Sequence, residues 1–163
     1  MVMESHSSSF SSAFDYENFD LDPSVSSVRI GKTTNTANVV IKDPVAMAGP
    51  ISIYGGDILL EEDLTSTLSG ADVLVKGRGD VEAVASRSFL TNNGDIVFWS
   101  NSDNSGVGSI KLGNDNVVNS SNGRSGDTDS GGGKITLGGG SGYGTSPTGY
   151  SSSSTGAGIK LGT

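Results

Sequence analysis

Four aspartates occupy equivalent places in the chain, each directly before the first apolar residue of a short apolar–x–apolar run: Asp57, Asp72, Asp80 and Asp95. Asp57 and Asp80 are 23 residues apart, as are Asp72 and Asp95. In a chain that coils with this period each pair would stack, and stacked carboxylates are candidate ligands for Ca²⁺. The competing interpretation is that each aspartate hydrogen-bonds the backbone of its own turn. We favour the turn interpretation and no cofactor, because two carboxylates supply few of the roughly six to eight oxygens that Ca²⁺ takes.

The residue types leave little room for catalytic chemistry. The chain has no Cys and one His, so a catalytic thiol is absent and a His-based triad or metal cluster has no second histidine to draw on. A polysaccharide-cleaving β-helix would gather acids and bases on one outer face, and the chain has such residues close together in sequence: Lys76, Arg78, Arg87, Asp80 and Glu82. Ordinary ion pairs on a solvated face explain the same residues. We therefore expect no enzymatic activity.

One strand contains a candidate binding residue. If Ile96 and Phe98 point into a core, Val97 and Trp99 point outward, because successive side chains of a strand alternate. An exposed Trp99 would offer a flat apolar face to a sugar or to a partner protein. Two alternatives remain open. The loop at 114–130 covers Trp99, or a one-residue shift of register buries Trp99 and exposes Phe98.

The strands that position these residues recur with a fixed period. The apolar–x–apolar runs are Ile58–Leu60, Val73–Val75, Val81–Ala83, Ile96–Phe98 and Ile110–Leu112. Val81 follows Ile58 by 23 residues, and Ile96 follows Val73 by the same number. Such a period is typical of stacked repeats, in which each coil returns about 4.8 Å above the last. The sequence therefore predicts an all-β fold, a parallel β-helix (β-solenoid) with coils of about 23 residues.

This period also predicts which residues are neighbours in adjacent coils. Val81 should lie over Ile58 and Ala83 over Leu60. In the same way, Ile96 should lie over Val73 and Phe98 over Val75. Each pair should be parallel, with both side chains turned inward.

The distribution of apolar residues divides the chain into three parts. Residues 25–112 hold 27 of the 38 Leu, Ile, Val and Phe residues, so the solenoid core is expected at 24–113. Residues 1–23 form an acidic, Ser-rich leader, either disordered or a cap on the first coil. Residues 114–163 contain two further strands, at 133–138 and 157–162, separated by Gly/Ser-rich segments that we interpret as long loops from one corner. Both Ser/Gly-rich ends are expected to be flexible, and the end within a repeat suggests part of a longer protein.

Charge and hydropathy exclude two classes of partner. The formal net charge of −8 leaves nothing to neutralise phosphates, so a nucleic-acid partner is not expected. No apolar run approaches the roughly 18 residues that a membrane span needs. The start, MVMESHSSSFSSAF, lacks the basic and apolar regions of a signal peptide, so export would require a signal upstream or another route.

The central run resembles a known family of repeats. The stretch Ala48–Gly113, with YGGDILL, GADVLVKGRGDVEA and NNGDIVFW, resembles repeat modules of large bacterial surface proteins of the filamentous haemagglutinin type. Those repeats often read TxxGxIxLxG and contain GGDI-type strands. The preceding VRIGKTTNTANVVIK is similar to the segment that leads into such modules. The resemblance covers roughly residues 25–138 and implies a right-handed parallel β-helix, with no catalytic motif to transfer.

The resemblance also implies a function. We expect a structural stalk segment of a secreted or surface-anchored bacterial adhesin, which acts in cell adhesion as part of a longer chain. Its partners would be neighbouring repeats and a host-surface glycan or protein. The alternative is a solenoid that binds or cleaves carbohydrate through its outer face.

Overall fold

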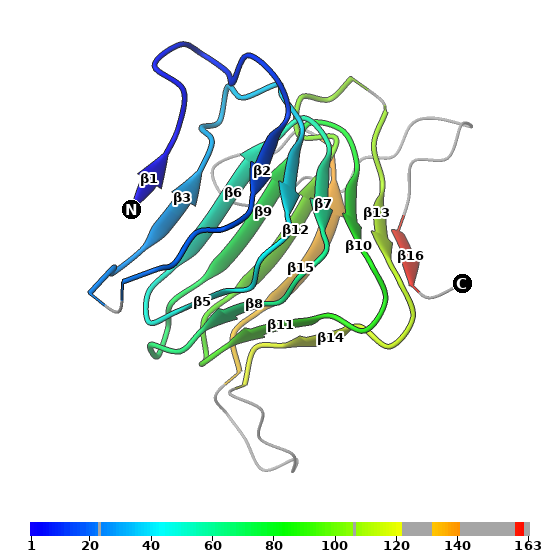
Figure 1. The fold of residues 1–163 in the computed structure, drawn as a ribbon. Coiled ribbons are helices and arrows are strands. Elements are labelled where there is room, and N and C mark those ends of the chain that lie inside the picture. The colour runs from blue at the N-terminus through cyan, green and yellow to red at the C-terminus, as the bar shows by residue number, and fades with distance from the viewer. Residues whose placement is uncertain (23, 106, 122–131, 141–158, 162–163) are drawn as a thin grey trace.

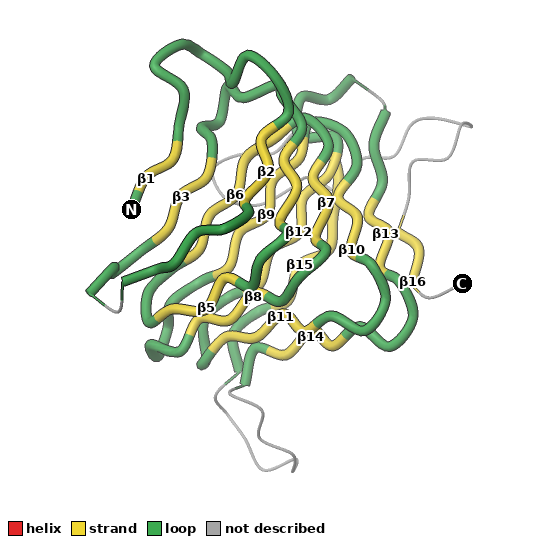
Figure 2. Tube along the Cα trace, in the orientation of Figure 1, coloured by secondary structure: helices red, strands yellow, loops and turns green. Residues whose placement is uncertain are grey.

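The computed structural model describes residues 1–22, 24–105, 107–121 and 132–140, together with the backbone of 159–161. These residues form three parallel sheets wound around one interior, and no helix occurs among them (Figures 1 and 2). None of this part of the chain could therefore cross a membrane as a helix. The prediction of an all-β parallel solenoid is confirmed.

Two of the sheets have six strands each. Sheet A runs in the order β1 (Val2–Met3), β3 (Val28–Ile30), β6 (Ile51–Gly55), β9 (Val73–Gly77), β12 (Ile96–Ser100) and β15 (Ile135–Gly139). Sheet B runs in the order β2 (Phe14–Tyr16), β4 (Val39–Ile41), β7 (Ile58–Leu60), β10 (Val81–Ala83), β13 (Ile110–Leu112) and β16 (Ile159–Leu161). Each coil therefore contributes one strand to each of these sheets.

The third side of the solenoid is a sheet that the sequence patterns did not predict. Sheet C contains β5 (Val45–Met47), β8 (Leu64–Ser66), β11 (Ser88–Thr91) and β14 (Val117–Asn119). Each of the strands β8 and β11 has one large apolar and one small polar residue at its inward positions. These are Leu64 and Ser66 in β8, and Phe89 and Thr91 in β11. Ser66 Oγ donates to Gly49 O at 2.9 Å, so its hydroxyl is satisfied although the residue is buried.

The predicted register is confirmed at all four positions. Val81 pairs with Ile58 and Ala83 with Leu60 in sheet B. Ile96 pairs with Val73 and Phe98 with Val75 in sheet A. The two interleaved series in the sequence are thus two sides of the same coil, and all of these side chains are buried in one apolar cluster.

The core follows from the alternation of side chains along the strands. The burial of β6 and β9 alternates over five residues, with Ile or Val at the first two inward positions and Gly at the third. β-Branched side chains suit these positions because they pack well on a pleated surface that is covered on its inner face. Phe98 adds an edge-on contact with Phe89, with ring centroids 5.0 Å apart, so the aromatic rings of sheets A and C meet in the interior.

The leader covers the N-terminal end of the solenoid. Strand β1 pairs with β3, and β2 pairs with β4, so the leader supplies one strand to each of sheets A and B. The ring of Phe14 stacks on that of Phe10 with centroids 4.7 Å apart, and the ring of Tyr16 stacks on that of Phe19 with centroids 5.0 Å apart. Residues 1–22 thus lie against the first coil through two strand pairings, and whether they act as a cap remains a prediction.

The C-terminal strands differ from the expected arrangement in one respect. Ile110–Leu112 and Ile135–Leu137 have similar sequences, but they lie in different sheets, because β15 pairs with β12 whereas β13 pairs with β10. Strand β16 then returns to pair with β13. The two Gly/Ser-rich segments therefore connect different pairs of sheets, and the prediction that both leave one corner was wrong. The segments themselves, and the flexibility expected of them, lie outside the described residues.

Candidate functional site

The four aspartates of the candidate cation site lie at two corners of the solenoid, immediately before strands of sheets A and B. The carboxylate of Asp57 accepts a hydrogen bond from the backbone N–H of Asp80 at 2.9 Å, one coil further along. The carboxylate of Asp72 accepts from the N–H of Asp95 at 2.7 Å in the same way. The expectation that each aspartate bonds its own turn is wrong, because the acceptor belongs to one coil and the donor to the next.

Both rows continue beyond these pairs. Asp80 accepts from the N–H of Ser109 at 2.7 Å, and Asp95 accepts from the N–H of Lys134 at 2.7 Å. At the start of the sheet B row, the side-chain oxygen of Asn38 accepts from the N–H of Asp57 at 2.9 Å. We call each such bond a corner clip. The clips supply acceptors for corner N–H groups that lie between the hydrogen-bond ladders of two sheets.

Glycine in the Gly-Asp pairs has a steric role in the clip. A Cβ built on Gly79 would lie 2.1 Å from Oδ1 of Asp57, the oxygen that accepts from the N–H of Asp80. A side chain at residue 79 would thus occupy the place of the carboxylate from the coil below. At the pair Gly79-Asp80, the glycine leaves room for the carboxylate of Asp57 and the aspartate supplies the acceptor for the next coil.

Asp80 has the largest set of charge-assisted contacts in its row. Besides the N–H of Ser109, it accepts from the hydroxyl of Ser109 at 3.0 Å and from the ammonium of Lys111 at 2.5 Å. Partial burial opposes ionisation, but the hydrogen bonds from Lys111 and Ser109 outweigh it and lower the pKa of Asp80. The hydrogen bond between Lys111 and Asp80 raises the pKa of Lys111. The side chain of Asp80 is 34% exposed and that of Lys111 is 42% exposed, so solvent screens the attraction between them.

The aspartates at these corners bind backbone N–H groups. One oxygen of each aspartate is already committed to a backbone N–H one coil away. No three His, Cys, Asp or Glu side chains gather as metal ligands within the described ranges. Since Ca²⁺ takes roughly six to eight oxygens, the groups at these corners fit hydrogen bonding between coils better than metal binding.

Trp99 is the second candidate, and the structure places it on the outer face of sheet A. It pairs with Lys76, which in turn pairs with Tyr54, so the three side chains form an outward row across β6, β9 and β12. Trp99 is nevertheless fully buried, and its indole N–H donates to the carbonyl of Gly140 at 2.7 Å. The exposed platform, one of the alternatives that the sequence left open, is therefore not presented. Val97, the other outward residue of β12, is 8% exposed.

Lys76 completes this outer cluster. Its ammonium lies 3.6 Å from the centroid of the Trp99 ring, a cation–π contact. Desolvation by burial lowers the pKa of Lys76. The alternative that a shifted register buries Trp99 inside the core is wrong, because Phe98 occupies the inward position in register with Val75.

The acids and bases considered for polysaccharide cleavage are not gathered in one place. Arg78 pairs with Asp103 at 3.4 Å, and Arg87 pairs with Glu62 at 2.9 Å. Lys76 lies on sheet A, and Asp80 lies at the corner that precedes sheet B. Asp80 and Glu82 share Lys111 as their ion-pair partner, whereas Lys76, Arg78 and Arg87 make other contacts around the solenoid.

Sequence analysis missed three residues that belong to these clusters: Asn38, Lys76 as the partner of Trp99, and Lys111 as the partner of Asp80. Lys111 could have been found, because it stands two residues after the position equivalent to Asp80 in the next coil. The six additional residues between Val81 and Ile110 obscured that equivalence, since the spacing there is 29 rather than 23.

The fold and its clips define a class of protein, a parallel β-solenoid with hydrogen-bonded corners. Comparison with known proteins adds no relative to this description. No family model matches the chain, and neither a curated protein nor a solved structure is significantly similar to it.

Proposed function

We propose that this solenoid is a structural stalk segment of a secreted or surface-anchored bacterial adhesin, without catalytic activity of its own. The observation that carries the proposal is the pair of clip rows, in which side chains at two corners connect each coil to the next. A stalk must transmit force along its axis, and connections between successive coils serve that purpose. The resemblance of residues 25–138 to filamentous haemagglutinin-type repeats supports the same role.

The stalk proposal assigns the binding of a host glycan or protein to other parts of a longer chain. In the described solenoid, Arg78, Arg87 and Asp80 are held in ion pairs and a clip, which suits a structural surface better than a reaction centre. The large aromatic side chain of the outer face, Trp99, is covered. These features support a spacer whose neighbours along the chain are further repeats.

A second candidate is carbohydrate binding or cleavage through the outer face of sheet B. A groove of about 310 Å³ lies there, with Val40 and Leu59 as an apolar floor. Asp57, Asp80 and Glu82 also line it. A sugar could place its apolar face on the floor and its hydroxyls toward the carboxylates.

Two measurements test the proposal. The purified chain is applied to a glycan array and incubated with a panel of bacterial and plant polysaccharides, with product release measured as reducing ends. The stalk proposal predicts neither binding nor release. Release from any polysaccharide overturns it, and binding that Glu82→Ala and Leu59→Ser abolish assigns the groove of sheet B instead.

The location of the protein is tested on cells of the organism that produces it. Antibodies raised against the purified chain should label intact cells as strongly as permeabilised cells. An antibody against a cytoplasmic enzyme serves as the control and should label only permeabilised cells. Labelling by the anti-solenoid antibody only after permeabilisation would contradict the surface location.

A further inference from the structure

The end of strand β14 carries a motif that the stalk function does not use. Asn119, Ser120 and Ser121 read Asn-x-Ser, with a residue other than proline in the middle. This is the acceptor motif of asparagine glycosylation, which attaches a bulky sugar at the surface of a protein. Asn119 is the only asparagine of the chain that has Ser or Thr two positions later. The motif therefore makes Asn119 a candidate for modification by a sugar.

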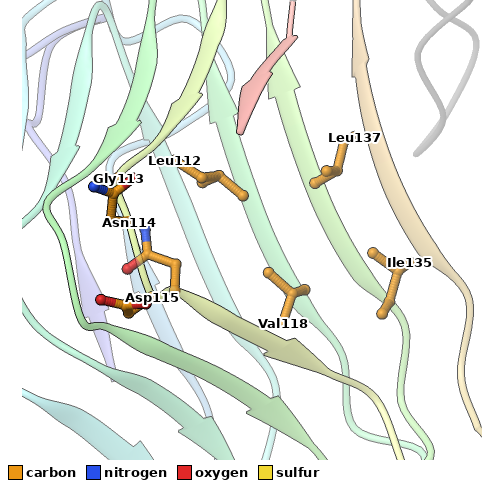
Figure 3. A pocket seen from close by; sticks show the side chains of 8 residues that line it. Leu112, Gly113, Asn114, Asp115, Val118, Ile135 and Leu137 are labelled. Atoms are coloured by element: carbon orange, nitrogen blue, oxygen red, sulfur yellow. The ribbon is translucent and has the colours of Figure 1, made fainter. Parts of the chain in front are cut away.

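Alternation along β14 directs Asn119 outward. Val118, the residue before it, faces the interior, where it lines the cavity of about 520 Å³ that Figure 3 shows. Successive side chains of a strand point to opposite faces, so Asn119 lies on the outer face of sheet C. The register agrees, because Val118 pairs with buried Phe89 whereas Asn119 pairs with half-buried Leu90. Asn119 is itself half-buried, and its side chain is on the side of the sheet that faces solvent.

A turn after β14 holds the amide of Asn119 in one orientation. Its Oδ1 accepts two hydrogen bonds from Ser121, one from the backbone N–H at 2.8 Å and one from the hydroxyl at 2.8 Å. A backbone N–H can only donate, so the atom that it contacts is the amide oxygen and the other atom is the nitrogen, Nδ2. The hydroxyl of Ser120 donates to the carbonyl of Gly133 at 2.6 Å, and the carbonyl of Ser120 accepts from the N–H of Asn93 at 2.9 Å. Neighbouring segments thus fix the middle residue of the motif.

The two hydrogen bonds from Ser121 favour reaction at the amide nitrogen. An asparagine amide is a weak nucleophile, because the nitrogen lone pair is delocalised into the carbonyl group. When Nδ2 gives up a proton during an attack, negative charge develops on Oδ1, and donors that already point at this oxygen stabilise it. Ser121 supplies two such donors. Nδ2 makes no hydrogen bond with the residues that the structure describes, so the attack displaces no partner among them.

The outer face of sheet C differs in charge from the other two. The four strands of sheet C, with the sequences VAM, LTS, SFLT and VVN, contain no charged residue. Sheet A, in contrast, has Lys76 on its outer face, and sheet B has Glu82. Next to Asn119 lie Leu90 in the adjacent strand and Val117, which is 47% exposed, roughly 7 Å away along the same strand. A sugar on Asn119 would cover this apolar surface with its C–H groups and turn its hydroxyls to water.

We propose that Asn119 is a glycosylation site, whose amide nitrogen receives a sugar from a glycosyl diphosphate. Ser121 is a positioning residue, because it acts through the amide oxygen of Asn119. The inference goes beyond the stalk function and does not depend on it, since it rests on the motif, the turn and the outer face of sheet C.

The transfer balances without oxidation or reduction. Nδ2 of Asn119 attacks the anomeric carbon of the sugar, and a bond forms between that nitrogen and that carbon. The bond from the carbon to the diphosphate oxygen breaks, and its electron pair leaves with the diphosphate. The proton of Nδ2 passes to a base of the glycosyltransferase. Nucleotide-linked and lipid-linked sugars share this chemistry.

Mass spectrometry of the chain purified from the organism that produces it tests the proposal. The peptide that contains Asn119 should carry the mass of at least one sugar residue, and fragmentation that preserves side-chain modifications should place the sugar on Asn119. Asn119→Gln should abolish the modification, whereas Ser121→Thr keeps the hydroxyl and should keep the sugar. Circular dichroism should show that both variants are folded. An unmodified Asn119 in the native chain overturns the proposal, as does a sugar on Ser120 or Ser121 instead.

Transfer in vitro measures the contribution of Ser121 and distinguishes the two classes of donor. Chain made in a host without asparagine glycosylation is incubated with the soluble fraction of the native organism and UDP-linked glucose, galactose and N-acetylglucosamine, or with its membrane fraction, which holds lipid-linked sugars. Transfer in the soluble arm indicates a nucleotide-linked donor, and transfer only in the membrane arm indicates a lipid-linked donor; either result supports the proposal. Ser121→Ala should lower the initial rate by about 100-fold, because it removes one donor to Oδ1. Equal rates for Ser121→Ala and the intact chain overturn the role of the turn, and no transfer in either arm overturns the site.

Discussion

Replacement of Asp80 tests whether the corner clips stabilise the solenoid. Asp80→Ala removes the acceptor for the N–H and hydroxyl of Ser109 and for the ammonium of Lys111. Asp80→Asn keeps an oxygen that can accept from the N–H, as Asn38 does for the N–H of Asp57. The two variants therefore separate the hydrogen bond from the charge.

The expected loss follows from the exposure of the groups. A hydrogen bond to a charged group contributes about 1.5–3 kcal/mol, and we take the lower limit because the carboxylate is 34% exposed. The partly exposed ion pair with Lys111 adds about 0.5 kcal/mol. Asp80→Ala should thus lower the free energy of unfolding by about 2 kcal/mol. Asp80→Asn should lower it by about 0.5–1 kcal/mol, since it loses the ion pair and weakens one hydrogen bond.

The assay uses Trp99, the only tryptophan, as a fluorescent reporter of urea unfolding, with amide hydrogen exchange at Ser109 as a local measure. Solenoids can unfold coil by coil, so the exchange measurement isolates the corner that the substitution affects. Glu61→Ala is the control, because Glu61 makes no side-chain hydrogen bond or ion pair among the described residues, and it should leave both measurements unchanged. Equal effects of Asp80→Ala and Glu61→Ala, or of Asp80→Ala and Asp80→Asn, would refute the clip argument.

The pH dependence of stability provides an independent check on the same residue. The pKa of Asp80 is lower in the folded protein than its ordinary value of 3.8, so the clip contributes fully above that value. The contribution is lost as the pH falls through the folded pKa. Below about pH 4 the intact chain should therefore lose more stability than Asp80→Asn, which has no proton to gain at this site.

Three further predictions concern the core, the outer face and the leader. Ile96→Asp places an unpaired charge in the core and should unfold the neighbouring coils. Val97→Asp, on the outward side of the same strand, should lower the free energy of unfolding by less. Circular dichroism and urea unfolding compare the two variants, and equal losses of stability would contradict the assigned faces. Iodide should quench the fluorescence of Trp99 poorly until urea is added, and strong quenching of the native protein would contradict its burial. Deletion of residues 1–22 should lower the melting temperature and cause aggregation, because it uncovers the first coil; a soluble monomer with an unchanged melting temperature would show that the leader is not a cap.

The sequence by itself determined the central strands of sheets A and B and the register of β7 with β10 and of β9 with β12. Alternation of apolar side chains is a local property, and a constant spacing of 23 residues is sufficient to place Val81 over Ile58 and Ile96 over Val73. Sheet C could not be predicted in this way. Its inward positions include Ser66 and Thr91, polar residues that the apolar alternation does not mark as inward. The hydroxyl of Ser66 is satisfied in the interior by the carbonyl of Gly49 from another segment, and that of Thr91 by the carbonyl of Gly94 in the following turn.

The roles of the candidate site residues were decided by the tertiary structure. The sequence placed Asp57 and Asp80 at corresponding corners, but the distance between coils determines that the carboxylate of one reaches the N–H of the next. Likewise, alternation placed Trp99 on the outer face, and only the approach of Gly140 and Lys76 from distant parts of the chain buries it. Similar strands at Ile110 and Ile135 lie in different sheets for the same physical reason: a local pattern specifies a strand, whereas its sheet depends on the length and path of the connecting segments.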